Sequence, residues 1–388
     1  MIGIMYVHSS NELYGADRSL LRLVNRIKDR YSPLVILPTD LPYQGLLSKH
    51  LEQSHIECLS LDIAVIRRRY YNPVGVINLF CKTVTSIRDL RSLVSSRSVA
   101  LIHSNTMAVL SGAFAAYHSR IPHIWHIREI VTESKLFMYL ITRLINRFSS
   151  VVIAVSNAVK ENLILYNSEL SSKVLVVNNG LDLKPFLTTS RYADGLRSSW
   201  GADNSKVVIG MVGRISDVKG QSYLLDVISK IKNIRSVKVV FVGGTLPGEE
   251  WRIEALQEKA RRLMIDNVVI FEGFCEDTSE YMKAFDIFVL PSTQPDSFPN
   301  VVLEAMAAAK PIVANGWGGV IEQVEDKVSG FLVAPNNPSA MAEKIDFLVE
   351  NPALRKDFGE AARARAVANF TLERHIQQML TIYEDIIQ

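Results

Sequence analysis

The sequence contains few cysteines and no long apolar run. Its three cysteines, Cys58, Cys81 and Cys275, lie far apart and form no C-x-x-C pair. This spacing excludes a disulfide framework and a zinc ribbon, and it is typical of a reducing cytosol. No stretch of about 18 uninterrupted apolar residues occurs, so no helix is predicted to span a membrane. Residues 1–7 lack the basic segment and the cleavage site of a signal peptide and instead predict a first strand.

A large excess of charge of one sign is also absent. The 43 Lys and Arg residues nearly balance the 40 Asp and Glu residues, which leaves a net charge of +3. Such a small excess does not indicate a nucleic-acid-binding protein. No G-x-G-x-x-G sequence follows a predicted strand, which argues against a dinucleotide-dependent dehydrogenase.

What is present is an alternation of short β-branched runs with longer amphipathic runs over 388 residues. The alternation predicts parallel βαβ units, and the length favours two domains because single cores stop growing near about 250–300 residues. Strands are expected at 2–8, 34–37, 99–103, 123–127, 151–155, 174–177, 207–212, 237–242, 268–272, 287–290, 312–314 and 331–333. We expect domains over 1–185 and 186–370, a polar linker at 183–203, and a final helix, 371–388, that packs back toward the first domain.

One segment after an expected strand carries a long and specific pattern. Residues 291–307 read PSTQPDSFPNVVLEAMA and residues 310–314 read KPIVA, so that seven residues separate Asp296 from Glu304. The pattern resembles that of glycosyltransferase family four, a large family of retaining enzymes that includes sucrose synthases and bacterial mannosyl- and glucosyltransferases. The resemblance implies the α/β fold called GT-B, in which two Rossmann-like doubly wound domains face each other across a cleft that holds a nucleotide-sugar donor.

Three further stretches match the family in the expected order. Residues 213–220 resemble its phosphate-binding turn, residues 155–157 and 179–182 resemble its segments near the domain boundary, and residues 14–18 resemble its first glycine-containing loop. The resemblance covers essentially the whole chain and is strongest over 207–335.

Arg214 and Lys219 are the expected phosphate-binding and catalytic cations. They follow the strand at 207–212, and open parallel sheets bind ligands at the carboxyl ends of their strands. Cations held there stabilise the charge on a leaving phosphate more strongly in the transition state than in the ground state. Without the resemblance, a Gly-Arg pair followed by a Lys is more often a solvated turn. Gly213, which begins the turn, is included among the donor-binding residues.

Asp296 and Glu304 are the expected partners of the donor's hydroxyl groups. The resemblance implies that Glu304 accepts hydrogen bonds from the ribose, and that Asp296 holds hydroxyls of the transferred sugar or orients its ring. The family more often has Glu at the position of Asp296, so the identity of the donor sugar stays open. Ser297 and Phe298 are included in the donor site, although Asp-Ser before Phe-Pro is also typical of a helix cap. The helix expected near Pro299 would offer free N–H groups to a phosphate.

Three residues from other loops complete the expected site. Phe274 lies in a turn that by resemblance frames the nucleobase, although packing in the core is an alternative. Gly15, in the first loop, lets backbone N–H groups approach a phosphate. His126 falls where the family has a His that contacts the donor sugar or the reacting centre, although a His after an apolar run is more often structural. His123 and His126 point to opposite faces of a strand, so the pair predicts no zinc site.

The sequence contains no D-x-D triplet, the motif with which nucleotide-sugar enzymes of another fold hold a divalent cation. It therefore predicts a reaction without metal or cofactor, with His126, Arg214, Lys219 and Asp296 as catalytic residues. No well-placed carboxylate nucleophile is evident, so we expect same-face attack in which the departing phosphate accepts the acceptor's proton. A sugar-nucleotide epimerase of the same fold and a non-catalytic sugar-nucleotide-binding scaffold stay open as alternatives.

The resemblance predicts the class of acceptor, and one helix predicts where in the cell the protein acts. The family implies a lipid-linked glycan acceptor in bacterial O-antigen, capsule or exopolysaccharide synthesis, with UDP or GDP in the donor. Residues 135–148 form a cationic amphipathic pattern with Lys135, Thr142 and Arg143 on its polar side, and the arginines at 67–69 would extend its charge. Such a helix can lie on an anionic membrane, here the cytoplasmic face of the plasma membrane, although a core-facing helix has the same pattern.

Overall fold

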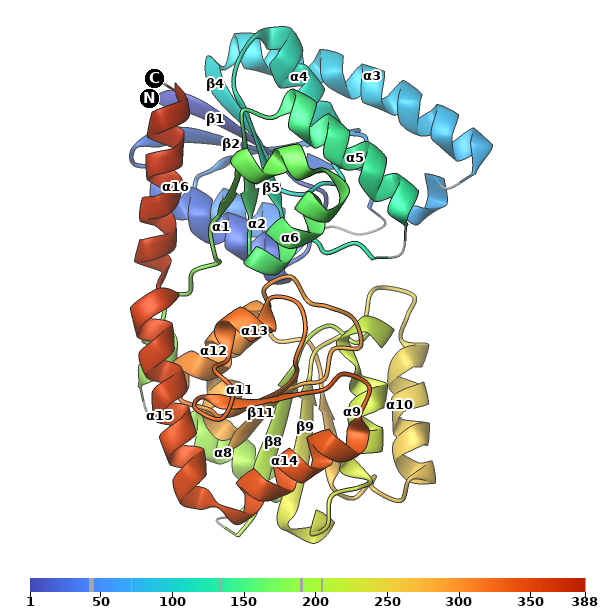
Figure 1. Ribbon diagram of the computed structural model, residues 1–388, viewed down its shortest axis with the longest axis vertical. Coiled ribbons are helices and arrows are strands. Elements are labelled where there is room, and N and C mark those ends of the chain that lie inside the picture. Colours follow the sequence, from blue (N-terminus) through green and yellow to red (C-terminus); the bar gives the residue numbers. More distant parts are fainter. Residues whose placement is uncertain (42–44, 71, 133, 189–190, 204, 388) are drawn as a thin grey trace. The chain divides into compact units, whose positions relative to one another are not determined.

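The computed structural model describes residues 1–388 except 42–44, 71, 133, 189–190, 204 and 388. The chain forms two compact units: unit 1 is Met1–Gly180 with Glu373–Gln388, and unit 2 is Leu181–Leu372. Each unit is a parallel sheet covered by helices (Figure 1). The α/β class and the two Rossmann-like doubly wound domains expected from the sequence are confirmed.

Unit 1 is built on a 7-stranded parallel sheet in the order β3-β2-β1-β4-β5-β6-β7. Its strands are β1 Ile2–Val7, β2 Tyr31–Pro38, β3 Glu57–Leu61, β4 Val99–Ser104, β5 His123–Ile127, β6 Val151–Ala154 and β7 Val174–Val176. The central strands bury nearly every side chain, which is why they stand out in the sequence as apolar runs. The sequence did not predict β3, because this edge strand has only exposed and half-buried residues.

Helices cover both faces of this sheet. They are α1 Gly15–Ile27, α2 Leu46–Gln53, α3 Pro73–Ser96, α4 Ser111–Ser119, α5 Lys135–Phe148 and α6 Asn157–Tyr166, with short 3-10 turns η1 Arg68–Tyr70 and η2 Ser168–Ser172. Side chains of Asn72, Ser134 and Ser156 cap the first turns of α3, α5 and α6. Helices α3 to α6 contact one another in sequence order, as expected for right-handed crossovers along one face from β3 to β7.

The last helix, α16 Leu372–Ile387, returns the end of the chain to unit 1. Glu384 of α16 pairs with Arg30 at 2.7 Å, and Tyr383 is fully buried. The first strand (blue) and the last helix (red) therefore belong to the same unit (Figure 1).

Unit 2 contains a 6-stranded parallel sheet in the order β10-β9-β8-β11-β12-β13. Its strands are β8 Val207–Val212, β9 Val237–Val242, β10 Val269–Glu272, β11 Ile287–Leu290, β12 Ile312–Asn315 and β13 Gly330–Val333. Its helices are α7 Lys184–Leu187, α8 Arg191–Ser199, α9 Gln221–Ile228, α10 Trp251–Arg262, α11 Ser279–Ala284, α12 Asn300–Ala307, α13 Val320–Gln323, α14 Pro338–Glu350 and α15 Pro352–Asn369, with turns η3 Asp217–Lys219 and η4 Ile234–Ser236.

The segment expected to be a linker, 183–203, is instead part of unit 2. It contains α7 and α8, and both helices contact α11. Arg197 of α8 donates to the Ala284 carbonyl at 2.8 Å and pairs with Asp286. The polar composition of the segment concealed these short helices, because only a few of its residues face the unit.

The faces of α5 differ in part from the expected ones. The helix has the expected bounds, but Thr142, predicted on the polar side, is buried and its hydroxyl donates to the Met138 carbonyl at 2.7 Å. Arg67 and Arg69 do not extend a basic patch, because both pair with Asp40. The side chain of Arg68 lies outside the described part of the chain. Among the described residues, no helix is long and apolar enough to cross a membrane.

Candidate active site

The order of strands in unit 2 reverses between β8 and β11. From β8 the chain builds outward through β9 to β10, and it then returns to β11 and builds the other way to β13. At such a switch point a crevice forms outside the carboxyl ends of the strands, and ligands of open α/β sheets bind there. The loops that follow β8 and β11 hold Arg214, Lys219 and Asp296, so three predicted site residues lie at this point.

Two glycines allow the neighbouring loops to approach each other closely. Gly220 has a left-handed φ of +82°, and a Cβ there would lie 2.2 Å from the carbonyl oxygen of Pro291. Gly243, after β9, has φ of +149°, and a Cβ there would lie 2.1 Å from the carbonyl oxygen of Gly213. Larger residues would push these loops apart. The predicted phosphate-binding loop is therefore fixed by neighbours on two sides.

The first residue of α9 holds this loop from within. The buried Gln221 side chain donates to the Arg214 carbonyl at 3.0 Å and accepts from the Ser216 N–H at 3.3 Å. These two bonds fix the backbone on both sides of Ile215 and so set where the Arg214 side chain leaves the loop.

Lys219 and Asp296 form an ion pair between the two loops. Their side chains are 32% and 16% exposed, so the pair is accessible to a ligand. The Asp296 carbonyl also accepts a hydrogen bond from the Gly319 N–H at 2.7 Å, which fixes its backbone. The structure thus joins a predicted cation and a predicted acid that are 77 residues apart in the sequence.

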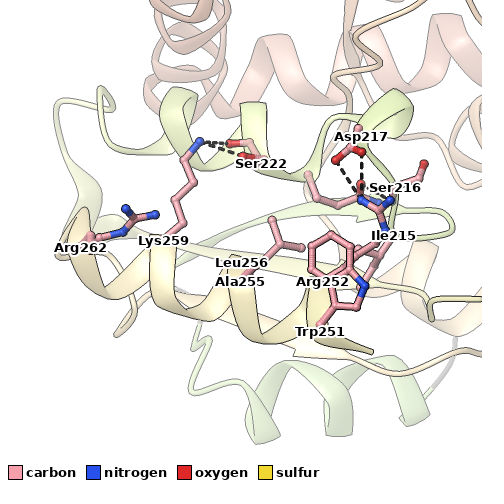
Figure 2. Close-up of a pocket in the computed structure, with 11 residues that line it drawn as sticks. Ile215, Ser216, Asp217, Ser222, Trp251, Arg252, Ala255, Leu256, Lys259 and Arg262 are labelled. Atoms are coloured by element: carbon pink, nitrogen blue, oxygen red, sulfur yellow. Dashed lines mark hydrogen bonds and ion pairs between the residues drawn. The ribbon is translucent and has the colours of Figure 1, made fainter. Parts of the chain in front are cut away.

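Behind the phosphate loop, unit 2 has a cavity of about 220 Å³ between the η3–α9 segment and α10. Figure 2 shows Arg252 of α10 reaching Asp217, and Lys259 reaching Ser222. Arg252 Nη1 lies 3.0 Å from each carboxylate oxygen of Asp217. The predicted site residues are not among those that line this cavity. Its walls tie η3, the turn that carries Lys219, to α10.

Glu304 lies on α12 with only 3% of its surface exposed. The hydroxyl of Thr278, also buried, donates to Glu304 Oε2 at 2.7 Å. A carboxylate at this depth requires hydrogen-bond partners. Thr278 stands just before α11, so this bond joins the segment after β10 to α12 and orients the predicted ribose-binding group.

The other residues predicted to contact the donor differ in how far their side chains are exposed to solvent. Phe274 is 41% exposed, and its Cβ would lie 3.2 Å from a Cβ on Gly244. Phe298 is buried with its ring centroid 5.6 Å from that of Phe370, so its side chain belongs to the core and only its backbone could meet a ligand. Ser297 follows Asp296 along the same loop, and Pro299 is the N-cap of α12 rather than its first residue.

Unit 1 has a switch point of the same kind, between β1 and β4. Gly15 is exposed there and begins α1, rather than lying in a loop as expected. Asp17 is buried and lies 3.0 Å from His8 Nε2, and it accepts from the Tyr14 N–H at 3.1 Å. Burial opposes ionisation of Asp17, but hydrogen bonds from His8 and Ser10 outweigh it and lower its pKa.

His126 lies inside β5 and is fully buried. Its Nδ1 is 3.2 Å from His103 Nε2 on β4 and 3.5 Å from Arg128 Nη2. Its Nε2 has no hydrogen-bond partner among the described residues. Burial lowers the pKa of His126 well below its ordinary value, and the positive charge of Arg128 lowers it further. The ring is therefore neutral.

Arg128 is a buried cation held by two amide oxygens. It donates to Asn105 Oδ1 at 2.9 Å and to Asn179 Oδ1 at 2.7 Å. Burial lowers its pKa to about 10, so it keeps its charge at neutral pH. His123, by contrast, bonds Ser104 on the other face of the sheet at 2.9 Å. The expectation that His123 and His126 point to opposite faces is confirmed.

Several residues that hold this site were not singled out from the sequence. Gln221 fixes the phosphate loop, Thr278 orients Glu304, and Arg252 braces η3. Each is a polar residue near the end of a helix, and in the sequence alone such residues cannot be told from solvated ones.

Comparison with known proteins identifies the family. Residues 194–365 match the family described as Glycosyl transferases group 1, and residues 14–185 match Glycosyltransferase Family 4. The crystal structure of Anabaena HepE in complex with UDP-glucose is 28% identical, with a TM-score of 0.84 over 99% of this chain and 100% of that one. The chain belongs to the GT-B glycosyltransferases of family four.

Other relatives of this family-four glycosyltransferase agree with the assignment. The capsular polysaccharide biosynthesis glycosyltransferase CapM of Staphylococcus aureus is 25% identical over 343 residues, which cover 83% of this chain and 87% of that protein. An uncharacterized glycosyltransferase of Methanocaldococcus jannaschii is 28% identical over 237 residues, 60% of this chain and 59% of that protein. Membership of the family favours glycosyl transfer over the epimerase and scaffold alternatives.

Proposed function

We propose that this glycosyltransferase moves a sugar from a UDP-sugar to an acceptor, with retention of configuration and without a bound metal. The observation that carries the proposal is the ion pair of Lys219 with Asp296 at the switch point of unit 2, with Arg214 earlier in the loop that carries Lys219 and Glu304 on the helix that follows Asp296. HepE, whose structure contains UDP-glucose, supports UDP as the donor nucleotide.

The cations act on the diphosphate of the donor. In the free protein Asp296 neutralises Lys219. When the donor binds, its phosphate oxygens compete for the Lys219 ammonium and release Asp296 for the hydroxyls of the sugar, because charged hydrogen bonds to phosphate are strong. Arg214 and Lys219 then stabilise the charge that grows on the leaving oxygen, which is the task of a divalent cation in other enzymes.

The remaining groups orient the donor. Glu304, oriented by Thr278, accepts hydrogen bonds from the ribose hydroxyls. The exposed ring and backbone of Phe274, with the backbone at Ser297 and Phe298, frame the nucleoside and the phosphates. By resemblance to the family, Gly15, which begins α1, and the imidazole of His126 are further contacts of the donor.

Retention follows from attack on the face that the phosphate leaves. The bond from the sugar carbon to the phosphate oxygen breaks as the acceptor oxygen approaches on the same side. The proton of the acceptor hydroxyl passes to the departing phosphate oxygen, which the two cations keep in place. The reaction then needs no carboxylate nucleophile.

The acceptor in this proposal is a lipid-linked glycan of bacterial surface polysaccharide synthesis, which places the enzyme on the cytoplasmic face of the plasma membrane. The similarity to CapM supports the acceptor class. The exposed apolar side chains of α3 and α5 support the membrane position. Both helices contact α4 and so lie in one layer of unit 1.

The surface of these two helices has the chemistry of a membrane-binding face. No side chain is buried over residues 76–85 of α3, and Ile77 and Phe80 are 65% and 68% exposed. Leu136 and Leu140 at the start of α5 are 70% and 54% exposed. The two helices carry six basic residues against one acidic residue, Asp89; the basic ones are Lys82, Arg88, Arg91, Lys135, Arg143 and Arg147. Apolar side chains among cations suit an anionic lipid surface.

The test of the transfer chemistry uses hydrolysis of UDP-glucose and GDP-mannose by the purified protein. Lys219→Ala and Arg214→Ala should each lower kcat/KM by about 100-fold or more, the scale of losing one stabiliser of transition-state charge. Lys230→Ala, at an exposed lysine after α9, is the matched control and should keep full turnover. Activity should persist in EDTA, and proton NMR should show the first-formed sugar product in the donor's anomeric configuration.

Two outcomes would contradict the proposal. Near-normal turnover of both cation variants would remove Lys219 and Arg214 from the phosphate site. Loss of activity in EDTA that Mn²⁺ or Mg²⁺ restores would show that the enzyme depends on a metal ion.

A further inference from the structure

A line of buried polar side chains runs from the last helix of the chain to His126. Tyr6 on β1 donates to the Tyr383 hydroxyl on α16 at 2.9 Å. Tyr383 lies 2.9 Å from His103 Nδ1, and His103 Nε2 lies 3.2 Å from His126 Nδ1. All four side chains have no exposed surface. Water therefore does not compete for these bonds.

The direction of each bond follows from counting protons. A hydroxyl has one proton to donate. Tyr383 accepts a hydrogen bond from Tyr6, so it donates its own proton to His103 Nδ1. A neutral imidazole has one N–H and one lone pair, so His103 carries its proton on Nε2 and donates it to His126 Nδ1. His126 must then carry its own proton on Nε2.

The position of Arg128 independently indicates the same tautomer of His126. The Arg128 guanidinium has only donors, and its Nη2 lies 3.5 Å from His126 Nδ1. A lone pair on Nδ1 suits this neighbour, whereas an N–H there would face another donor. The proton count applies because both rings are neutral, since burial and the charge of Arg128 lower the pKa of His103 and of His126.

We propose that Tyr383 is a positioning residue that, through His103, fixes His126 in the tautomer with its proton on Nε2. His126 then presents an N–H donor at an atom that has no partner among the described residues. In the proposed function this donor serves an oxygen of the ligand, either a hydroxyl of the transferred sugar or a phosphate oxygen, and the site must open to admit it because His126 has no exposed surface here. The identity of this oxygen rests on the proposed function, whereas the tautomer is a property of the protein alone.

The structure offers a closely matched pair of variants. Tyr383→Phe removes the hydroxyl that donates to His103. Tyr6→Phe removes a buried hydroxyl of the same line one step earlier, and it leaves the Tyr383 hydroxyl free to donate to His103 as before. Tyr6→Phe loses one buried hydrogen bond and Tyr383→Phe loses two, so Tyr383→Phe should lose more stability, and the tautomer is read separately from that loss.

The tautomer is measured by NMR on the full chain labelled with ¹⁵N-histidine, without any ligand. The His126 signals are assigned by their loss in His126→Gln. The wild type and Tyr6→Phe should show His103 and His126 protonated on Nε2 only. Tyr383→Phe should show a share of the Nδ1–H form at both rings. The shift should be partial rather than complete, because Arg128 remains beside His126.

A second readout uses UDP-glucose as the probe. Tyr383→Phe should lower kcat in proportion to the fraction of His126 that loses its Nε2 proton, with little change in KM, because the hydrogen bond from Nε2 is lost from that fraction of the molecules. Tyr6→Phe should keep both constants within about two-fold of the wild type. A wild-type His126 protonated on Nδ1, or identical tautomers in all three proteins, would overturn the proposal. If the wild type does not turn over UDP-glucose, the donor assignment fails while the NMR result still decides the tautomer.

Discussion

Unit 1 buries histidines that have to stay uncharged. Burial lowers the pKa of His123 to about 3 and that of His375 to about 4, and the charge of Arg128 adds to the shift of His375. His375 Nδ1 also lies 2.8 Å from the Asn178 carbonyl, where the neutral ring donates its one proton. In an unfolded chain a histidine titrates near 6.5. In mild acid the folded protein therefore binds fewer protons than the unfolded chain.

We expect unit 1 to lose stability as the pH falls from about 6.5 toward about 4. In this window the unfolded chain binds more protons, so the free energy of unfolding rises with pH, by at most about 1.4 kcal/mol per pH unit for each histidine. The measurement is the urea midpoint at which β5 peptides lose protection from hydrogen exchange, taken across this range.

Two variants separate this effect from a general acid sensitivity. His375→Gln keeps a donor for the Asn178 carbonyl but binds no proton, so its pH slope should be smaller than that of the wild type. His118→Gln changes an exposed histidine of α4 and should leave the slope unchanged. Equal slopes in His375→Gln and the wild type would be incompatible with the linkage.

The sequence could indicate a candidate site residue only where that residue differs in chemical type from the residues around it. Lys219 and Arg214 follow the end of an apolar strand, and Glu304 interrupts an apolar helix, so the resemblance to the family could predict a role for each of them. Thr278 and Tyr383 could not, since their roles depend on what folding brings beside them. Tyr383 is 280 residues from the His103 that it contacts.

The apolar sequence of α3 disagrees with its exposed environment. Its apolar residues surround most of its circumference, a pattern that normally predicts burial. The neighbouring helix α4 has 9 residues, whereas α3 has 24, so α4 is too short to cover it. Sequence patterns reveal the apolar faces of a helix but not the length of the element that packs against it. β3 and the helices within 183–203 were missed for another reason, because few of their residues are buried.

The exposed half of α3 predicts binding to anionic vesicles. Ile77→Ser with Val84→Ser should lower the partition coefficient at least about ten-fold, because full burial of an aliphatic side chain contributes about 1.5–3 kcal/mol. The measurement is co-sedimentation with vesicles of mixed anionic and neutral lipid at low salt, and added salt should weaken binding.

The control replaces an Ile and a Val with similar exposure in unit 2. Ile321 and Val367 are each 51% exposed, against 65% for Ile77 and 53% for Val84. The Ile321→Ser and Val367→Ser double variant should bind as the wild type does. A wild type that stays in the supernatant, or equal binding by the two double variants, would show that α3 does not contact lipid.

The two units differ in how many stretches of the chain form them. Unit 2 is one continuous stretch, whereas unit 1 is closed by residues from both ends of the chain. The buried part of α16 consists mainly of Ile376, Met379, Ile382 and Tyr383. At about 1.5–3 kcal/mol each, these side chains contribute as much as the typical total stability of a domain, about 5–15 kcal/mol.

Deletion of residues 373–388 should therefore abolish cooperative unfolding of unit 1 and leave that of unit 2 in place. Calorimetry gives the number of transitions, and hydrogen exchange assigns each one to a unit. Glu384→Ala breaks only the partly exposed pair with Arg30 and should cost less than about 1 kcal/mol. A unit 1 transition that survives the deletion would mean that α16 is dispensable for its core.

The return of α16 also sets an order of events during synthesis. The ribosome makes most of unit 1 before unit 2, yet the nascent chain cannot form the Tyr6–Tyr383 contact until α16 emerges. Unit 2, made later, has all of its residues before α16 is complete. Domains generally fold as units during translation. The later unit can thus finish folding while the earlier one still lacks the helix that covers Tyr6.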